Sequence, residues 1–287
     1  MKKIASFLPV ILVTTLLHAQ TQVIKTVVPN KISLTVGQKI TVQSSISIES
    51  SLAPGMDVTN NSTSENILEV KSSTDKNYTI GSTLTKIKVN MDMMGQATTY
   101  DSEKKEDQES EMGKAFAEKL NKPTDVILDI NTGKASVEKK IEEKKNPVDG
   151  DPMQGLLKIM GDNGGDDAVV TGAFEIVPQG KNTGDNWSDS TVEKNMKVVR
   201  TYTLKSVTGK EAVIQLNMVM DAASTLSTQG MEVEFNSTTK TTGEIITDIE
   251  TGLVKKKTTQ ADISGSFQLM GQAVPISAKA NSTITYK

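Results

Sequence analysis

The sequence contains no cysteine and a single histidine, His18. Without cysteine the chain has no disulfide, no thiolate nucleophile and no thiolate ligand for a metal. His18 falls in an N-terminal segment with the pattern of a signal peptide, so the mature chain is expected to lack histidine as well. Serine–histidine and cysteine–histidine catalysis are then excluded. We therefore expect no cofactor, no metal site, no identifiable catalytic residue and a non-enzymatic role.

Aromatic residues are scarce, at 3% of 287 residues, and arginine occurs once, as Arg200. A core must therefore be built mainly from Ile, Val, Leu, Met and Ala. Bidentate recognition of phosphate and guanine relies on arginine, and stacking on bases relies on aromatic rings. Because the formal net charge is also negative, at −3, nucleic acid is not a predicted partner.

Long apolar runs are missing except at the N-terminus. Two lysines there precede an apolar stretch from Ile4 to Leu17, which His18-Ala19-Gln20 follows. This order is typical of a secretory signal peptide, and the run is shorter than the ~20 residues of a spanning helix. We expect residues 1–19 to be removed, leaving an exported soluble protein, periplasmic or extracellular, with no transmembrane span and no lipid-anchor cysteine. The alternative is an uncleaved membrane anchor.

The clearest strand pattern ends at Met93, where apolar residues alternate with polar ones from position 87 onwards. A period of two gives a strand one buried and one solvent-exposed face. Met94-Gly95 suits a tight turn, which would place Tyr100 opposite Val89 on the same face. The pattern therefore predicts a hairpin whose apolar side carries Val89, Met91, Met93 and Tyr100.

The strand pattern returns in the second half of the chain. IKVNMDM at 87–93 and IQLNMVM at 214–220 share the form I-x-(V/L)-N-M-x-M. The second copy places Leu216, Met218 and Met220 on one face. A longer turn, from about Asp221 to Gly230, is expected to follow it. The return strand then puts Phe235 in the position that Tyr100 holds in the first copy.

Further short motifs recur in the same order along the chain. They are VGQ (36–38) and TGD (183–185), VKSSTDK (70–76) and LKSVTGK (204–210), and DINTG (129–133) and DIETG (248–252). Ordered matches at several points indicate an internal duplication. We predict two β-rich repeats, at residues 28–145 and 172–287, joined by a connector at 146–171.

Two segments have helical rather than strand periodicity. Met112, Phe116 and Leu120 recur at helical spacing near 112–121, and Met153 and Met160 share an apolar stripe near 152–160 in the connector. The predicted fold is therefore mainly β, with one or two curved antiparallel sheets from two divergent repeats and two short amphipathic helices. Acidic loops at 149–151 and 162–167 suit either calcium or a solvated linker.

Several of the thirteen methionines fall on predicted inner faces. Methionine fills irregular cores, and it also lines adaptable apolar cavities, so both interpretations stay open. If a cavity is present, its candidate lining residues are Val89, Met91, Met93, Tyr100, Phe116, Met153, Met160, Leu216, Met218, Met220 and Phe235.

A family resemblance rests on N-M-x-M, the glycine turn and Tyr-Asp-Ser within 91–102, on the helix at 115–120, on DINTG at 129–133 and on GDNW at 184–187. In these features the chain resembles an uncharacterised family of exported bacterial β-rich proteins. More distantly, a curved sheet that holds helices on its concave side is similar to periplasmic lipoprotein-carrier half-barrels. The resemblance implies a fold, whereas the family supplies no activity or catalytic residues.

Three functions fit these observations. The leading hypothesis is non-enzymatic binding of a lipid or other hydrophobic small molecule in a Met-lined concavity. The alternative is a cell-envelope scaffold or surface-interaction module, whose protein partners the sequence does not indicate. The third is a carboxylate-based glycan hydrolase, which needs two carboxyl groups roughly 5–9.5 Å apart in a cleft.

Overall fold

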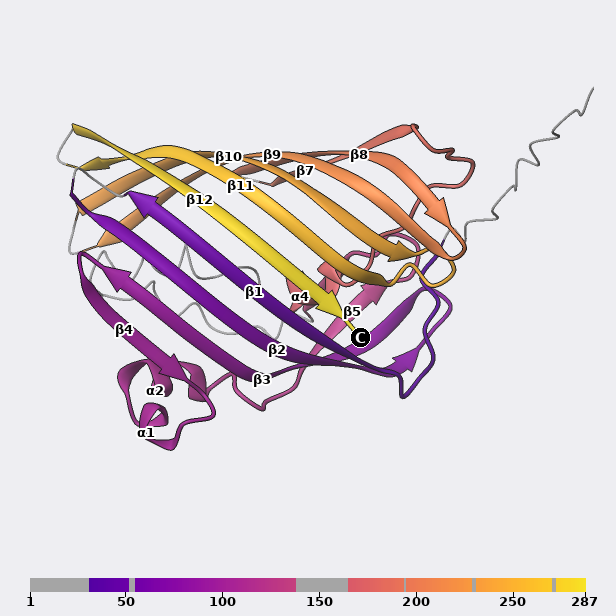
Figure 1. Cartoon of the computed structure of the whole chain (residues 1–287), viewed down its shortest axis with the longest axis horizontal. Coiled ribbons are helices and arrows are strands. Elements are labelled where there is room, and N and C mark those ends of the chain that lie inside the picture. Colours follow the sequence, from indigo (N-terminus) through magenta and orange to yellow (C-terminus); the bar gives the residue numbers. More distant parts are fainter. Residues whose placement is uncertain (1–30, 52–54, 138–164, 194, 229–230, 270–271) are drawn as a thin grey trace, which may run out of the picture.

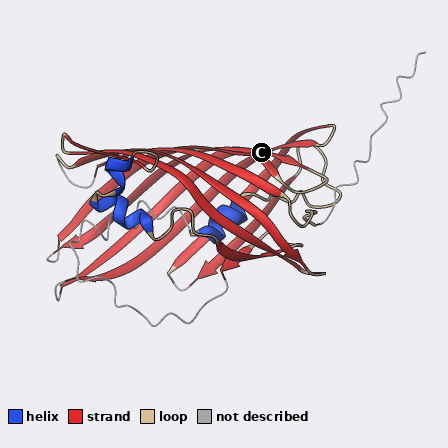
Figure 2. Cartoon of the chain, turned by 90° about the horizontal axis from the view of Figure 1, so that it is seen from below, coloured by secondary structure: helices blue, strands red, loops and turns tan. Residues whose placement is uncertain are grey.

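The computed structural model describes residues 31–51, 55–137, 165–193, 195–228, 231–269 and 272–287. Within these ranges the chain forms one open antiparallel sheet of twelve strands and three short helices. The sheet is strongly curved, and the helices lie on its concave side (Figures 1 and 2). The expected mainly β fold with a curved antiparallel sheet is confirmed.

The strands vary in length from three to eighteen residues. They are β1 (Lys39–Ser51), β2 (Asp57–Ser73), β3 (Asn77–Met93), β4 (Gln96–Asp101), β5 (Thr124–Asp129), β6 (Ala135–Val137), β7 (Asn186–Glu193), β8 (Met196–Thr208), β9 (Glu211–Thr228), β10 (Met231–Asp248), β11 (Val254–Leu269) and β12 (Gln272–Tyr286). The helices are α1 (Lys105–Gln108), α2 (Glu111–Ala117) and α4 (Asp166–Gly172).

The order of the strands places the two ends of the described chain side by side. It is β6-β5-β3-β2-β1-β12-β11-β10-β9-β8-β7, and β4 pairs separately with β3. The first strand, β1, pairs with the last, β12, from Val42 opposite Tyr286 to Ser51 opposite Ser277. Strands β1–β6 and β7–β12 thus form the two halves of one sheet, and they meet at this pair.

The predicted hairpin at Met93 is confirmed residue by residue. Met93 pairs with Gln96, Met91 with Thr98, and Val89 with Tyr100. Met94 and Gly95 both have positive φ angles, of 56° and 80°, which is the turn that matches the twist of the flanking strands. Tyr100 is only 2% exposed, so it closes the apolar side as expected.

The second hairpin differs from its prediction. The turn expected from about Asp221 to Gly230 is wrong, because β9 continues to Thr228 and β10 begins at Met231. Phe235 pairs with Ser224 and not with Leu216, so it does not take the position that Tyr100 holds opposite Val89. Asp221 is accommodated within the strand: it pairs with Thr238, whose hydroxyl donates to Asp221 Oδ1 at 2.8 Å. A polar residue in a sheet is tolerated where the opposite strand satisfies it.

The duplicated motifs form the same hydrogen bonds in both halves. Asp129 Oδ1 accepts from the backbone N–H of Thr132 at 2.8 Å, and Asp248 Oδ1 accepts from that of Thr251 at 3.0 Å. The glycines that close these two turns have φ angles of 69° and 72°. Each aspartate therefore replaces the backbone acceptor of a tight turn. The match supports two repeats, while the boundaries 28–145 and 172–287 stay a prediction.

The helices agree with the sequence in part. The helix expected near 112–121 is α2, and the Ser110 hydroxyl caps it by accepting from the N–H of Gly113 at 3.0 Å. The helix expected near 152–160 lies outside the described residues. Helix α4 was not expected: the end of the acidic segment 162–167 forms its first turn, where carboxylates favour a helix N-terminus.

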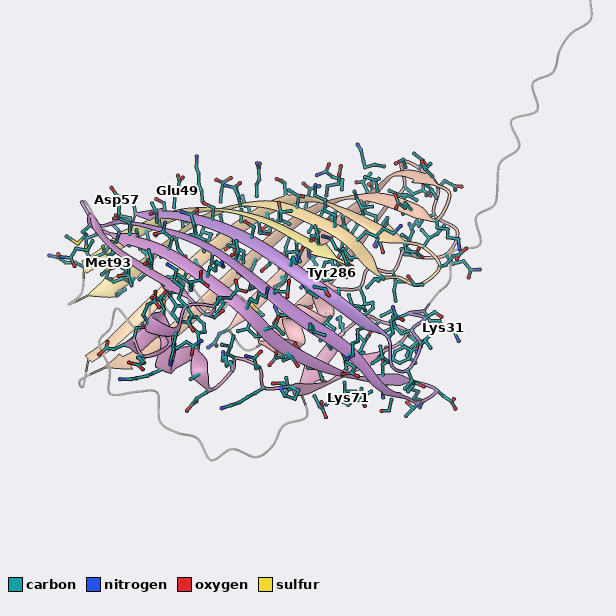
Figure 3. All side chains as sticks on the ribbon, turned by 60° about the horizontal axis from the view of Figure 1, so that its bottom comes forward. Lys31, Glu49, Asp57, Lys71, Met93 and Tyr286 are labelled. Atoms are coloured by element: carbon teal, nitrogen blue, oxygen red, sulfur yellow. The ribbon has the colours of Figure 1, made fainter. Side chains whose placement is uncertain are left out.

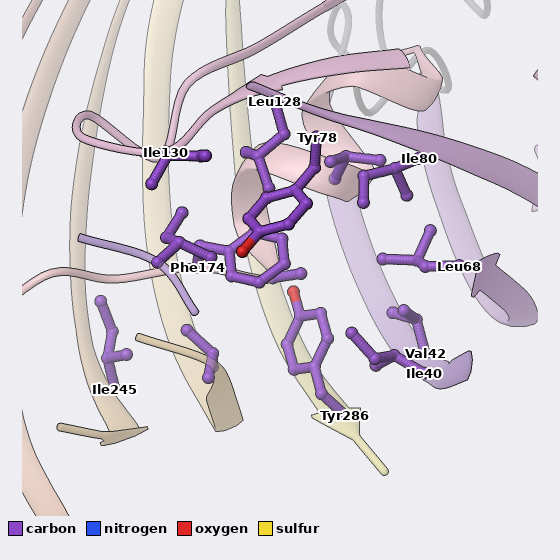
Figure 4. Packing of buried hydrophobic residues seen from close by; sticks show 14 of the residues in the cluster. Ile40, Val42, Leu68, Tyr78, Ile80, Leu128, Ile130, Phe174, Ile245 and Tyr286 are labelled. Atoms are coloured by element: carbon purple, nitrogen blue, oxygen red, sulfur yellow. The ribbon is translucent and has the colours of Figure 1, made fainter. Parts of the chain in front are cut away.

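The core lies at one end of the concave face, where α4 and the segment after it cover the sheet. Figure 3 shows Lys31 and Lys71 near this end and Met93 at the opposite end. Ser82 donates from its hydroxyl to Asp166 Oδ1 at 2.9 Å, which fixes the start of α4 to β3. The buried cluster includes Ile40, Val42, Leu68, Tyr78, Ile80, Leu128, Ile130, Phe174, Ile245 and Tyr286 (Figure 4).

Candidate functional site

A cavity of about 1320 Å³ opens on the concave face of the sheet. Strands from both halves form its floor, and residues of α2, α4 and the segment after α4 contribute to its walls. The buried core closes one end of the concavity. The site is therefore a consequence of the curvature of the whole sheet and not of a local loop.

Small side chains form the middle of the cavity floor. The cross-strand register aligns them, together with Ile46 and Ile48 of β1, in two neighbouring rows, Ser62–Ile46–Ser282–Thr259–Gly243 and Ile48–Ala280–Ala261–Thr241. The hydroxyls of Thr259 and Ser282 hydrogen-bond to each other at 2.8 Å, as do those of Ser44 and Ser64 at 2.6 Å. These four hydroxyls are thus satisfied within the sheet, and the short side chains leave space above the floor.

Two stacked aromatic pairs flank this floor. Tyr100 and Phe116 stack with ring centroids 5.3 Å apart, on the side of β4 and α2. Trp187 and Tyr202 stack at the same separation on β7 and β8. At one end of the first row, Ser62 pairs with Val89, which in turn pairs with Tyr100. At the other end, Gly243 pairs with Leu216, which pairs with Tyr202. Each of these two edges of the cavity therefore carries one stacked pair of rings.

The structure brings many of the predicted lining residues to one face. Phe116, Leu216 and Met218 line the cavity. The register places five more on the same face of the sheet, namely Val89, Met91, Met93, Met220 and Phe235. Tyr100 is buried against Phe116. Met153 and Met160 lie outside the described residues. The described lining contains more Ser, Thr and Ala than the methionine pattern indicated.

A charged cluster in the cavity was missed by the sequence analysis. It consists of Glu175, which follows α4, Asp189 on β7, Arg200 on β8 and Lys257 on β11. Arg200 Nη1 donates to Asp189 Oδ1 at 3.0 Å, and the Tyr202 hydroxyl donates to Asp189 Oδ2 at 3.4 Å. The one available signal was Arg200, the single arginine of the chain, in a strand next to an aromatic residue.

Burial controls the protonation of this cluster. It raises the pKa of Glu175 to about 7, an effect that the positive charge of Lys257 opposes. It lowers the pKa of Lys257, which Glu175 in turn opposes. Burial also raises the pKa of the Tyr202 hydroxyl, and the negative charges of Glu175 and Asp189 add to this effect. Since burial disfavours a charged form, Glu175 titrates near neutral pH and not in the acidic range of an exposed carboxyl group.

The described residues contain no group of three or more potential acidic, histidine or cysteine ligands for a metal ion. None of the helices in the described ranges has the length and apolarity that a membrane crossing needs.

A family model matches residues 75–254, which is more than half of the chain. The chain belongs to DUF6263, a family of unknown function. The motifs that carried the expected resemblance, at 91–102, 115–120, 129–133 and 184–187, all lie within the matched residues of this DUF6263 protein. Membership of an uncharacterised β-rich family is therefore confirmed.

Among the solved structures to which the DUF6263 protein is similar is one described as "lipid-protein interactions in lipovitellin". The two share 11% sequence identity at a TM-score of 0.47. The match covers 89% of this chain but 25% of the lipovitellin chain, so this protein spans about a quarter of its length. No curated protein matches the sequence of this DUF6263 member.

Proposed function

We propose that this protein binds an apolar or amphiphilic molecule, without catalysis, in the cavity on the concave face. The observation that carries the proposal is the cavity of about 1320 Å³ above a floor of small, mutually hydrogen-bonded side chains. Typical small-molecule sites occupy roughly 300–1,000 Å³. The space therefore suits a long-chain molecule, and the aromatic pairs supply apolar walls on both sides.

The binding free energy would come from burying alkyl groups. Each methylene transferred from water contributes roughly 0.8 kcal/mol, and ordering of the chain and lost translation oppose it. An alkyl chain needs no hydrogen bonds, so a floor that combines Ala and Ile side chains with internally paired hydroxyls suits it. We place this activity in an exported protein, because residues 1–19 have the pattern of a signal peptide.

The hydrolase hypothesis is less well supported by the same cavity. Glu175 and Asp189 are acidic residues that line it, and the raised pKa of Glu175 would suit a general acid. Asp189, however, is held by Arg200 through Oδ1 and by Tyr202 through Oδ2. Because both carboxylate oxygens have partners, neither is free to act as a base or nucleophile in this structure.

Binding can be tested with the purified protein and Nile red, a neutral dye whose fluorescence rises in apolar surroundings. We expect saturable fluorescence that dodecanol displaces with a stoichiometry near one, and a co-purifying hydrophobic molecule in native mass spectra. An absence of both dye binding and a co-purified molecule would contradict the proposal. A defined protein partner captured from envelope extract in their place would support the scaffold alternative.

A further inference from the structure

Lys257 occupies an unusual position on the cavity floor. On either side in the sheet its direct partners are Ile245 and Ile284, so the lysine interrupts an apolar row. Its neighbours along β11, Lys255 and Lys256, are exposed, and Lys255 forms an ion pair with Glu211 at 2.5 Å. Thr247 pairs with Val254 and Ile246 with Lys256, so Lys255 is the extra residue of a β-bulge. The bulge therefore places Lys255 and Lys256 in solvent and leaves Lys257 facing inward.

Within the described part of the chain, Lys257 and Glu175 differ from the neighbouring charges, which are paired with each other. Arg200 and Asp189 form an ion pair at 3.0 Å. Among the described residues, neither Lys257 nor Glu175 forms a side-chain hydrogen bond or ion pair. Lys257 is partly buried, and an ammonium group held away from water without a partner is costly. An anion placed in the cavity would remove that cost.

The sign of the charge follows from the groups that face Glu175. These are Lys257 from β11, Arg200 and Tyr202 from β8, and Asp189 from β7. When Glu175 is protonated, the two cations outnumber the one remaining carboxylate, and the site has a surplus of one positive charge. A protonated Glu175 can also donate a hydrogen bond to an oxyanion.

We propose that Lys257, supported by Arg200, binds the acidic headgroup of an amphiphile whose alkyl chain lies along the small-residue floor of the cavity. The proposal rests on the proposed function and specifies its ligand class. Carboxylate and phosphate headgroups share the required chemistry, an oxyanion that accepts charge-assisted hydrogen bonds.

The proposal predicts a loss that is specific to the charged headgroup. Lys257→Met is expected to weaken binding of dodecane-1-sulfonate about 10- to 100-fold, the effect of one charge-assisted hydrogen bond. Binding of dodecanol should change less than about twofold, because the alkyl contacts are retained. Dissociation constants from Nile red displacement at constant ionic strength give both numbers.

Lys256→Met is the matched control, because it removes a lysine at the adjacent position of the same strand from the exposed face. It should leave the affinity for the sulfonate unchanged. An equal loss for sulfonate and dodecanol in Lys257→Met, or no loss for either, would overturn the headgroup assignment. If neither compound binds the unaltered protein, the proposed function itself fails. Dodecanoate and dodecyl phosphate, compared in the same assay, then distinguish a carboxylate from a phosphate ligand.

A second variant tests the role of Glu175. The sulfonate keeps its charge between pH 6 and pH 8, so its affinity should rise as the pH falls through about 7, where Glu175 becomes protonated. Glu175→Gln imitates the protonated side chain. It is expected to bind the sulfonate at pH 8 about as tightly as the unaltered protein does at pH 6. Weaker binding by Glu175→Gln at pH 8 would contradict an anionic ligand and favour a cationic or zwitterionic one.

Discussion

Replacement of Ile32 by alanine is expected to lower the free energy of unfolding by about 2–5 kcal/mol. Ile32 is 1% exposed, and its side chain lies between the two duplicated turns. Its Cδ1 lies 3.5 Å from the position that a Cβ atom on Gly133 would take, and its Cγ1 lies 3.5 Å from the corresponding position on Gly252. The truncation would therefore open a cavity between these two turns.

The backbone around Ile32 explains why the effect should be large. The N–H of Ile32 donates to Ile130 O at 2.8 Å, and that of Ser33 donates to Thr251 O at 3.1 Å. One short segment is thus hydrogen-bonded to a turn of each half, and the Ile32 side chain fills the space between them. Because these hydrogen bonds hold the backbone of the segment to both turns, the structure has little freedom to collapse around the atoms that the alanine lacks.

Chemical denaturation followed by circular dichroism measures this difference. The control is Val36→Ala, which removes apolar atoms from the same segment at a position that is 54% exposed. Its effect should stay within about 0.5 kcal/mol. Equal stability changes in the two variants would show that Ile32 does not connect the repeats.

Local patterns predicted the parts of the fold that depend on local chemistry. The hairpin at Met93 combines strict alternation with a turn that only a few residues favour, and its register was predicted correctly. The extension of β9 was missed because the segment 221–228 has no apolar alternation. Its strand conformation depends on pairing with β10, from Asp221 opposite Thr238 to Thr228 opposite Met231. The pairing of β1 with β12 is likewise a contact between distant parts of the chain.

The cavity was less visible in the sequence than the fold. A floor of Ser, Thr and Ala has the composition of a solvated strand face, and only the curvature of the sheet turns it inward. The charged residues are dispersed at positions 175, 189, 200 and 257, with no motif among them. The register of β7 with β8 brings Asp189 opposite Arg200. Sequence patterns identify apolar faces well, but they do not show which small or charged residues share one of those faces.

Replacement of Ala280 by tryptophan is expected to weaken binding of both Nile red and dodecanol at least about tenfold, because an indole ring would occupy the space of several buried methylenes. Ala280 lies in the middle of the floor, between Ile48 on β1 and Ala261 on β11, and it lines the cavity. The added ring points into open space, not into the packed core, so the folded state should tolerate it.

The matched control for this occlusion is Asn281→Trp, which adds the same ring at the next residue of β12, on the opposite, exposed face. It should keep the affinity of the unaltered protein for both compounds. Dye displacement gives the affinities, and thermal unfolding of both variants checks that the fold is retained. If Ala280→Trp folds and binds as tightly as Asn281→Trp, the ligand does not lie on this floor, and the proposed site is wrong. A loss confined to Ala280→Trp would place the alkyl chain on the small-residue rows, where the curvature of the sheet leaves space that none of the described side chains fills.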